Sequence, residues 1–252
     1  MISRTMHGFG YDAVHDEIVV ASPLAQAILT FRGGASGDEP PLRVIQGPHT
    51  QLLGTAYGGT ADRVVVDGVN GEIYTYSQLG HYVVFDRLAN GDVAPKRTFK
   101  AEGVRGGASL AIDPVNNLLV INSGDNGLLI FDRTVSGDAK PIRTIKGPKT
   151  GTAGIMTFQI NPSKGLIVSG CEAAFGSSLS VCAWSIHDDG DVAPRWKLPV
   201  AKLAGYQPNS IALDYVNKEI IMSSSSQGAQ QTIPVLDGIT GATFTFSWPE
   251  IF

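Results

Sequence analysis

The sequence predicts an all-β fold, a β-propeller of five blades that are each a four-stranded antiparallel sheet. The stretch 109–148 contains four short apolar runs separated by three turn signals, which is typical of an antiparallel meander. A strand that ends in a turn recurs five times, and the turns start at Asp12, Asp67, Asp113, Asn161 and Asp214. A second motif, Gly-Asp-x-x-Pro, recurs with the same rhythm from Gly37, Gly91, Gly137 and Gly190.

The spacing of these motifs sets the size and number of the blades. The five turn residues lie 55, 46, 48 and 53 residues apart. A period of about 40–50 residues with four strands per unit is typical of propeller blades. One such unit cannot bury both faces of its sheet, so successive units must pack face to face around an axis. Five copies fill the chain and favour five blades, and a six-bladed ring is the alternative.

We expect a single domain with blades at residues 8–48, 63–101, 109–148, 156–199 and 210–250. The Asp or Asn at the end of each inner strand can accept hydrogen bonds from the backbone ahead of it and start a turn. The Gly of Gly-Asp-x-x-Pro supplies a positive φ, and its Pro enters an outer strand where the missing N–H faces solvent. The fifth blade has Asp237–Gly241 in place of this motif.

The apolar runs give the individual strands. In the first two blades they are expected at 8–13, 17–21, 27–31 and 42–46, then 63–67, 72–76, 82–86 and 96–100. In the last two they are expected at 156–160, 166–170, 180–186 and 195–198, then 210–214, 219–223, 232–236 and 243–248. Phe85, Phe131 and Trp184 share one position of the third strands, which predicts that they pack between blades.

The repeats resemble those of bacterial NHL-repeat, YVTN and lactonase-like β-propeller proteins over nearly the whole chain. The resemblance lies in Asp113-Pro-Val-Asn-Asn-Leu-Leu-Val, Leu129-Ile-Phe-Asp-Arg, Asn90-Gly-Asp-Val-Ala-Pro and the Arg-x-Ile-x-Gly-Pro runs that start at Arg43 and Arg143. It implies a propeller fold. It leaves the function open, because these families include enzymes, ligand-binding proteins and interaction scaffolds.

Composition narrows the classes of partner. A net charge of −4 and a pI near 5.7 provide no long-range attraction for phosphate backbones, so we expect no nucleic-acid partner. No run of 18 apolar residues occurs, and we expect no membrane insertion. The first ten residues lack the apolar core of a secretion signal, so we expect a cytoplasmic protein or an exported one whose leader has been removed.

Two cysteines, Cys171 and Cys182, flank the turn of one expected hairpin. Cysteines in such positions are more often free thiols that pack as small apolar residues, and this is the expectation here. A disulfide is the alternative, which would require the two residues to face each other across neighbouring strands.

In a propeller, two sets of loops meet at one mouth of the central channel. One set joins the outer strand of each blade to the inner strand of the next blade, and the other joins the second strand of each blade to its third strand. Ligand sites favour such convergent loops on a rigid scaffold. Gln26 belongs to these loops, and the candidate ligand-binding residues are His49, His81, Arg105, Asp125, Glu172, Tyr206, Gln207 and Asn209. The first hypothesis is a non-catalytic propeller, expected to be a monomer, that binds a small molecule or a protein there.

A metal-assisted hydrolase of the lactonase type is the alternative, and it rests on the family resemblance. The resemblance implies one divalent metal ion at the mouth, for which His81, Asp125 and Glu172 are the candidate ligands. No Gly-x-Ser-x-Gly nucleophile motif occurs, and no closely spaced histidine pair marks a metal site. The sequence therefore leaves open whether the protein is an enzyme.

Overall fold

The computed structural model describes residues 8–53, 63–104, 109–123, 127–152, 155, 157–171, 180–199, 207–225, 241–247 and 251–252. They form an all-β structure that divides into two compact units. The first unit comprises Met1–Ala108 and Phe131–Pro141, and the second comprises Ser109–Ile130 and Ile142–Phe252. No helix in the described part of the chain is long and apolar enough to cross a membrane.

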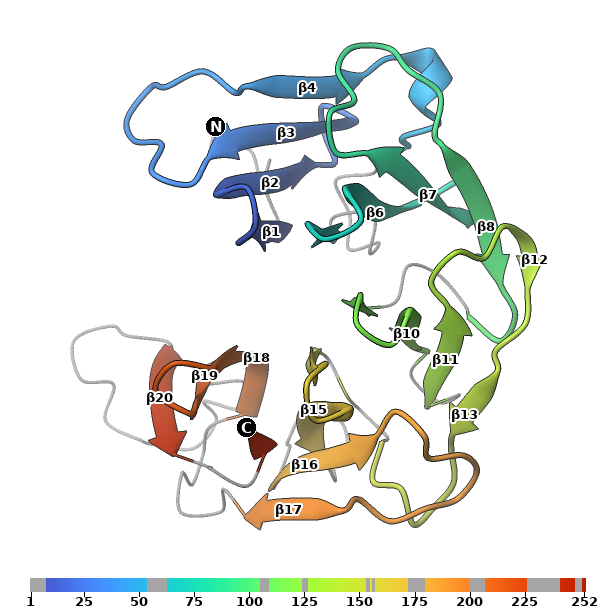
Figure 1. The fold of residues 1–252 in the computed structure, drawn as a ribbon, viewed down its shortest axis with the longest axis vertical. Coiled ribbons are helices and arrows are strands. Elements are labelled where there is room, and N and C mark those ends of the chain that lie inside the picture. Colours follow the sequence, from blue (N-terminus) through green and yellow to red (C-terminus); the bar gives the residue numbers. More distant parts are fainter. Residues whose placement is uncertain are drawn as a thin grey trace, which may run out of the picture. The chain divides into compact units, whose positions relative to one another are not determined.

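The first unit contains two sheets. The first sheet consists of β1 (Gly8–Asp12), β2 (Glu17–Ser22), β3 (Ala27–Arg32) and β4 (Arg43–Gln46), which lie side by side in chain order (Figure 1). A 3-10 turn, η1 (Pro48–Thr50), follows β4. The second sheet consists of β5 (Val64–Asp67), β6 (Glu72–Ser77), β7 (His81–Asp86) and β8 (Arg97–Ala101), and β12 (Gly137–Ala139) joins it beside β8.

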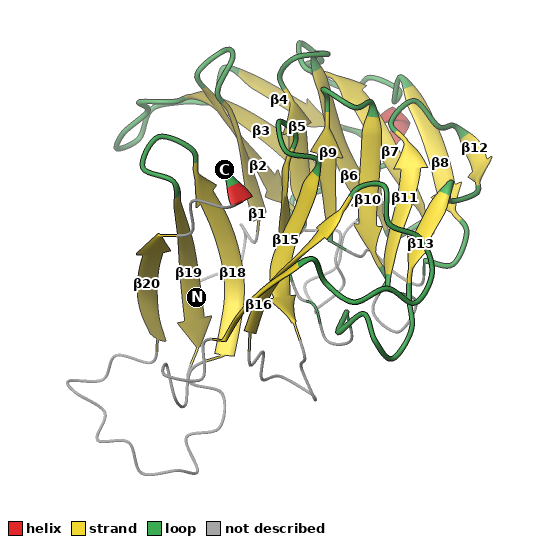
Figure 2. Ribbon diagram, turned by 60° about the horizontal axis from the view of Figure 1, so that its bottom comes forward, coloured by secondary structure: helices red, strands yellow, loops and turns green. Residues whose placement is uncertain are grey.

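The remaining strands form three further sheets. The third sheet contains β9 (Leu110–Asp113), β10 (Leu118–Asn122), β11 (Leu128–Asp132) and β13 (Arg143–Ile145), and the fourth contains β14 (Phe158–Asn161), β15 (Leu166–Cys171), β16 (Ser180–Ser185) and β17 (Trp196–Pro199). The fifth contains β18 (Gln207–Asp214), β19 (Glu219–Ser225) and β20 (Gly241–Ser247) (Figure 2). The four-stranded antiparallel order predicted for the first four repeats is confirmed.

The fifth sheet differs from the prediction. The strand expected at 243–248 was assigned to the outer position, but β20 pairs directly with β19, in the third position. Its register matches that of the other third strands: Glu219 faces Ser247, as Glu72 faces Asp86. The prediction failed because alternating apolar residues suit a third or an outer strand equally well. Gly-Asp-x-x-Pro lies between a third strand and an outer strand, whereas Asp237–Gly241 comes before the third strand of this sheet, so the two are not counterparts. The strand expected at 232–236 lies outside the described residues.

Buried apolar side chains join neighbouring sheets within each unit. Val19, Ile28 and Ile45 of the first sheet share one cluster with Ile73 and Phe85 of the second. The third and fourth sheets share a cluster around Trp184, and the fourth and fifth share another. The three aromatic residues at the shared third-strand position, Phe85, Phe131 and Trp184, are all fully buried, as predicted.

The Gly-Asp-x-x-Pro motif has a role that the sequence did not reveal, because it attaches one repeat to the outer strand of the repeat before it. Gly91 N donates to Val44 O (2.7 Å), and Gln46 N donates to Gly91 O (3.1 Å). The same pair of bonds recurs at Gly190, and β12 forms the longer, parallel version beside β8. Each of these outer strands therefore has its otherwise open edge covered by the following repeat.

The outer strand of the fourth sheet departs from this scheme. Pro199 faces Ser180 in the fourth sheet as Gln46 faces Ala27 in the first, so the two positions are equivalent. In the first sheet the N–H of Gln46 donates to the carbonyl of Gly91. Proline has no N–H, and a proline on an edge strand prevents further pairing at that point. Trp196 on the same strand is 42% exposed.

Cys171 and Cys182 form a disulfide with a Cα–Cα distance of 5.8 Å, and the expectation of free thiols was wrong. The two residues are not directly opposite each other. Cys171 faces Ser180 and Cys182 faces Ser169, so the bond crosses the β15–β16 pair diagonally. A symmetric turn would have placed them face to face. In the observed register Cys171 faces Ser180, two residues away from Cys182, and the Cα separation still suits a disulfide.

Candidate functional site

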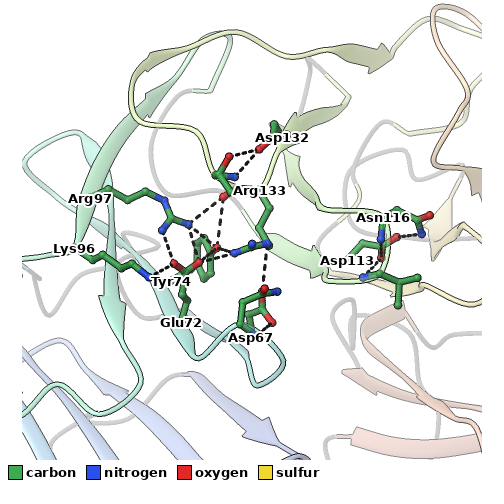
Figure 3. A network of polar contacts seen from close by, with 12 residues as sticks. Asp67, Glu72, Tyr74, Lys96, Arg97, Asp113, Asn116, Asp132 and Arg133 are labelled. Carbon is green, nitrogen blue, oxygen red and sulfur yellow. Dashed lines mark hydrogen bonds and ion pairs between the residues drawn. The ribbon is translucent and has the colours of Figure 1, made fainter.

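Among the described residues, the largest group of charged side chains surrounds Glu72, at the start of β6. Arg97 binds both carboxylate oxygens (2.6 and 2.8 Å), and Arg133 binds Oε2 (2.6 Å). Lys96 adds a contact of 2.9 Å, and Tyr74 donates its hydroxyl hydrogen to Oε2 (2.6 Å). Figure 3 shows the two guanidinium groups converging on Glu72 and Tyr74, with Arg133 also reaching Asp67.

The electrostatics of this group suit a structural role. Burial alone would raise the pKa of Glu72, but hydrogen bonds from Arg97, Tyr74 and Lys96 hold it far below its ordinary value. Burial and the hydrogen bond to Glu72 raise the pKa of Tyr74 above its ordinary value. A general acid or base works best with a pKa near the ambient pH. The pKa of Glu72 is lowered and the pKa of Tyr74 is raised, so both move further away from neutral pH.

A simpler copy of the group joins the first and second sheets. Glu17 Oε2 accepts from Arg43 (2.5 Å) and from Arg87 (2.7 Å). Arg43 and Arg97 stand at the same position of their outer strands, and each also donates to a backbone carbonyl, of Arg87 and of Arg133 respectively. We call the set Glu17, Arg43 and Arg87 the first clamp, and the set Glu72, Arg97 and Arg133 the second clamp.

The next pair of sheets replaces the charges with apolar groups. Leu118 stands where Glu17 and Glu72 stand, and Ile186 stands where Arg87 and Arg133 stand. Both are buried in the cluster between the third and fourth sheets, while Arg143 still donates to the carbonyl of Ile186 (2.8 Å). Because an apolar pair serves at the equivalent place, the two clamps are contacts between repeats and not a catalytic centre.

Half of the predicted ligand-binding residues lie outside the described residues: Arg105, Asp125, Glu172 and Tyr206. Gln207 and Asn209 lie in β18, where the structure describes their backbone. His49 lies on η1 with 76% of its side chain exposed, and its Nδ1 is 2.7 Å from Asp92. His81 begins β7, and its Nε2 is 3.0 Å from Oε1 of Gln51. The two histidines thus have separate partners.

The metal hypothesis stays a prediction. Of its three candidate ligands, His81 is the one that the structure describes. Within the described ranges, no three His, Cys, Asp or Glu side chains are grouped so that they could hold a metal ion.

A shallow depression opens between the first and second sheets, at the end where the two predicted sets of loops meet. The β2–β3 turn contributes Pro23 and Gln26, and the segment after η1 contributes Leu52 and Leu53. Its lining residues are Ala21, Ser22, Pro23, Gln26, Ala27, Ile28, Leu52, Leu53, Thr75 and Tyr76. This lining contains no carboxylate, amine, guanidinium or imidazole group.

Two glutamines beside this depression have left-handed backbones, with φ of 51° at Gln26 and 58° at Gln51. Glycine occupies the equivalent positions elsewhere. Gly80 precedes β7 as Gln26 precedes β3, with a φ of 94°. Gly151 follows Gly147-Pro-Lys-Thr as Gln51 follows Gly47-Pro-His-Thr, with φ of 69°. A side chain at such a φ costs about 1–2 kcal/mol that glycine does not incur.

Hydrogen bonds hold the wall of the depression in place. Ser77 donates its hydroxyl hydrogen to the carbonyl of Gln51 (2.6 Å), and Gln78 N donates to the carbonyl of Leu53 (2.9 Å). The Oε1 atom of Gln51 accepts from His81. Burial, and then the charge of Lys100, lower the pKa of His81, which favours its neutral form. We call Gln26, Gln51, His81 and the depression together the glutamine face.

Sequence reasoning identified part of this face. The β2–β3 turn and the segment after η1 both line the depression, and Gln26 belongs to that turn. His81 contacts Gln51 beside it. That these residues bind a ligand stays a prediction. Gln51 was missed. The signal that could have found it is the comparison of Gly47-Pro-His-Thr-Gln with Gly147-Pro-Lys-Thr-Gly, in which glutamine stands where the second copy has glycine.

Comparison with known proteins adds no family: no protein-family model matches the chain, and no curated protein does.

Proposed function

We propose that the protein is a five-bladed β-propeller that binds a partner at the glutamine face without transforming it. The observation that carries the proposal is the pair of glutamines held in left-handed backbone, each at a position where one other repeat has glycine, Gly80 and Gly151 respectively. Backbone strain of this kind persists where a side chain is needed, and it is concentrated at binding and active sites. Two such residues beside one depression support a binding role for that depression.

The chemistry of the lining favours binding over catalysis. Apolar side chains with a few neutral hydrogen-bonding groups are typical of recognition sites. The Nε2 atom of His81, which lies outside the lining, is bonded to Gln51.

The propeller part of the proposal rests on the repeats. Five sequence copies each form a sheet, and within each unit successive sheets bury apolar faces against one another. The resemblance to NHL-repeat and lactonase-like propellers supports the same arrangement. The first sheet also has apolar side chains on the face turned away from the second, including Phe9, which is 74% exposed. A closed ring would cover this face with the fifth blade.

The test of the binding role is an amide NMR screen of the wild-type protein against a mixed set of fragments and short capped peptides, without chelators and then with added Zn²⁺. The expected result is that the hits shift amides of residues 21–28, 51–53 and 75–77, and that the variant Gln26→Gly abolishes those shifts. Hits confined to other residues, or hits that survive the variant, would refute the site. Turnover that depends on the metal would instead establish the hydrolase alternative.

A further inference from the structure

The outer edge of the fifth sheet differs from that of the other four sheets. In each of those four, the third strand pairs with an outer strand. β20 pairs with β19 on one edge and, among the described residues, with no strand on the other (Figure 2). Ile251, the next described residue after β20, lies instead in the apolar cluster between the fourth and fifth sheets.

Thr245 lies in the middle of this edge. It faces Ile221 as Thr30 faces Val19, so Thr245 and Thr30 are counterparts. In the four other sheets the carbonyl of the counterpart accepts a backbone hydrogen bond from the start of the outer strand, at 2.7 or 2.8 Å; these residues are Thr30, Val84, Ile130 and Ala183. All four are at most 2% exposed, whereas Thr245 is exposed. The N–H and C=O of Thr245 therefore point to an edge that the described part of the chain leaves open.

The edge of β20 also lacks the features that prevent strands from pairing. Exposed edges are normally protected by charged residues or by proline. The outer strand of the fourth sheet, β17, has both, in Lys197 and Pro199. The sequence of β20, Gly241–Ser247, contains neither a charged residue nor a proline. This edge is therefore suited to pair with another strand.

The sequence of β20 suits a second copy of the same strand. Two identical strands can pair antiparallel about a two-fold axis, and an axis at Thr245 pairs this residue with Thr245 of the second copy. The same register places Phe244 opposite Phe246 of the second copy, and Thr243 opposite Ser247. Aromatic pairs and hydroxyl pairs stabilise antiparallel sheets, and no like charges meet in this register.

From these observations we infer that two copies of the protein form a dimer through their β20 strands, which pair antiparallel about Thr245 and join the two fifth sheets into one. The contact gives each fifth sheet the fourth strand that the other sheets have. It is independent of the glutamine face, and it replaces the monomer expected from the sequence.

The test is sedimentation equilibrium of the full chain from low to high micromolar concentration, where we expect a concentration-dependent dimer. Thr245→Pro should weaken the dimer about tenfold or more, because it removes from each copy an N–H that faces the partner. This N–H points away from β19, so the substitution keeps the β19–β20 hydrogen bonds. Thr245→Val is the matched control, because it keeps the N–H and should leave the dissociation constant unchanged.

A pair of charge variants tests the two-fold register. Thr245→Asp and Thr245→Lys should each weaken self-association about fivefold, because like charges then face each other across the axis. An equal mixture of the two variants should form a heterodimer, recognised by its mass in native mass spectrometry, that is tighter than either homodimer. A mixture without preferred heterodimers would contradict the register and overturn the inference.

A wild type that stays monomeric at high concentration, or a dimer that Thr245→Pro leaves unchanged, would also overturn the inference. Amide hydrogen exchange provides a check on the wild type alone. The N–H groups of Thr243 and Thr245 should be protected in the dimer and should exchange faster on dilution. Protection that is independent of concentration would mean that a segment of the same chain covers the edge, and the dimer would be wrong. None of these outcomes affects the proposed function.

Discussion

The two clamps and their apolar counterpart allow one prediction to be worked out in detail. The third and fourth sheets are joined by Leu118, Ile186 and an arginine that bonds a backbone carbonyl. The double variant Glu17→Leu/Arg87→Ile would give the first and second sheets the same three groups, because Arg43 stays and already bonds the carbonyl of Arg87. The single variant Glu17→Leu would instead leave both arginines facing a leucine.

The magnitudes follow from burial. The side chain of Glu17 is 9% exposed, and those of Arg43 and Arg87 are 16% and 15% exposed. Removing one partner of a buried ion pair costs about 3–5 kcal/mol, whereas replacing both partners with apolar groups is often neutral or stabilising. We expect Glu17→Leu to lower the free energy of unfolding by about 3 kcal/mol, toward the lower end because some exposure remains, and the double variant to lie within about 1 kcal/mol of the wild type.

The measurement is urea unfolding of the wild type, both single variants and the double variant, which form a double-mutant cycle. The expected coupling energy is about 2 kcal/mol or more, in the sense that the second substitution rescues the first. Additive losses, with the double variant less stable than either single variant, would refute the view that the clamp and the apolar pair are equivalent contacts.

Three further predictions concern stability. Folding lowers the pKa of Glu17 and of Glu72, so the stabilisation from their ion pairs is complete above the unfolded pKa of 4.5 and is lost as pH falls below it. The free energy of unfolding, measured between pH 6 and pH 3, should therefore fall more steeply in the wild type than in Glu17→Leu/Arg87→Ile. Equal slopes would contradict the clamp. Reducing the Cys171–Cys182 disulfide, which joins residues 11 apart, should lower the free energy of unfolding by about 3 kcal/mol, and an unchanged denaturation midpoint in reductant would count against the bond. If a closed ring covers the first sheet, Phe9→Asp should destabilise the protein by about 3 kcal/mol, whereas a loss under about 0.5 kcal/mol would mean that the face stays open.

Local patterns in the sequence were sufficient to place most strands. Alternating apolar residues between turn signals located the strands of the first four sheets to within a residue or two, because strand position depends on nearby residues. The same patterns located β20 along the chain but assigned it to the wrong position in the sheet, since that position depends on the partner strand and not on the composition of the strand itself.

Contacts between distant residues were beyond the sequence. His49 N bonds the carboxylate of Asp92, 43 residues away, and the Glu17–Arg87 pair spans 70 residues. Each residue alone looks like an ordinary surface polar group, and the pairing becomes visible when repeats lie beside one another. The disulfide was underestimated for a similar reason, because its diagonal geometry depends on a register that the hairpin sequence does not specify.

The meeting of the loops at the depression could be predicted from the sequence, and the residues that line it less so. The loops that meet at the depression follow from the order of strands in each repeat, which the sequence does encode. The importance of Gln51 depends on a backbone angle, which was visible in the sequence only indirectly, as a glutamine in place of a glycine.

The measurement that tests the central claim most directly is a paired determination, in Gln26→Gly/Gln51→Gly, of stability and of binding to the hits of the NMR screen. Replacing each glutamine with glycine should relieve about 1–2 kcal/mol of left-handed backbone strain in the folded state. The greater entropy of glycine in the unfolded chain should offset about 0.5–1 kcal/mol of that gain at each site. We expect a double variant that is more stable than the wild type by about 1 kcal/mol and that no longer binds the hits of the NMR screen. A variant that is less stable, or one that binds as well as the wild type, would show that the glutamines serve the fold and not a partner.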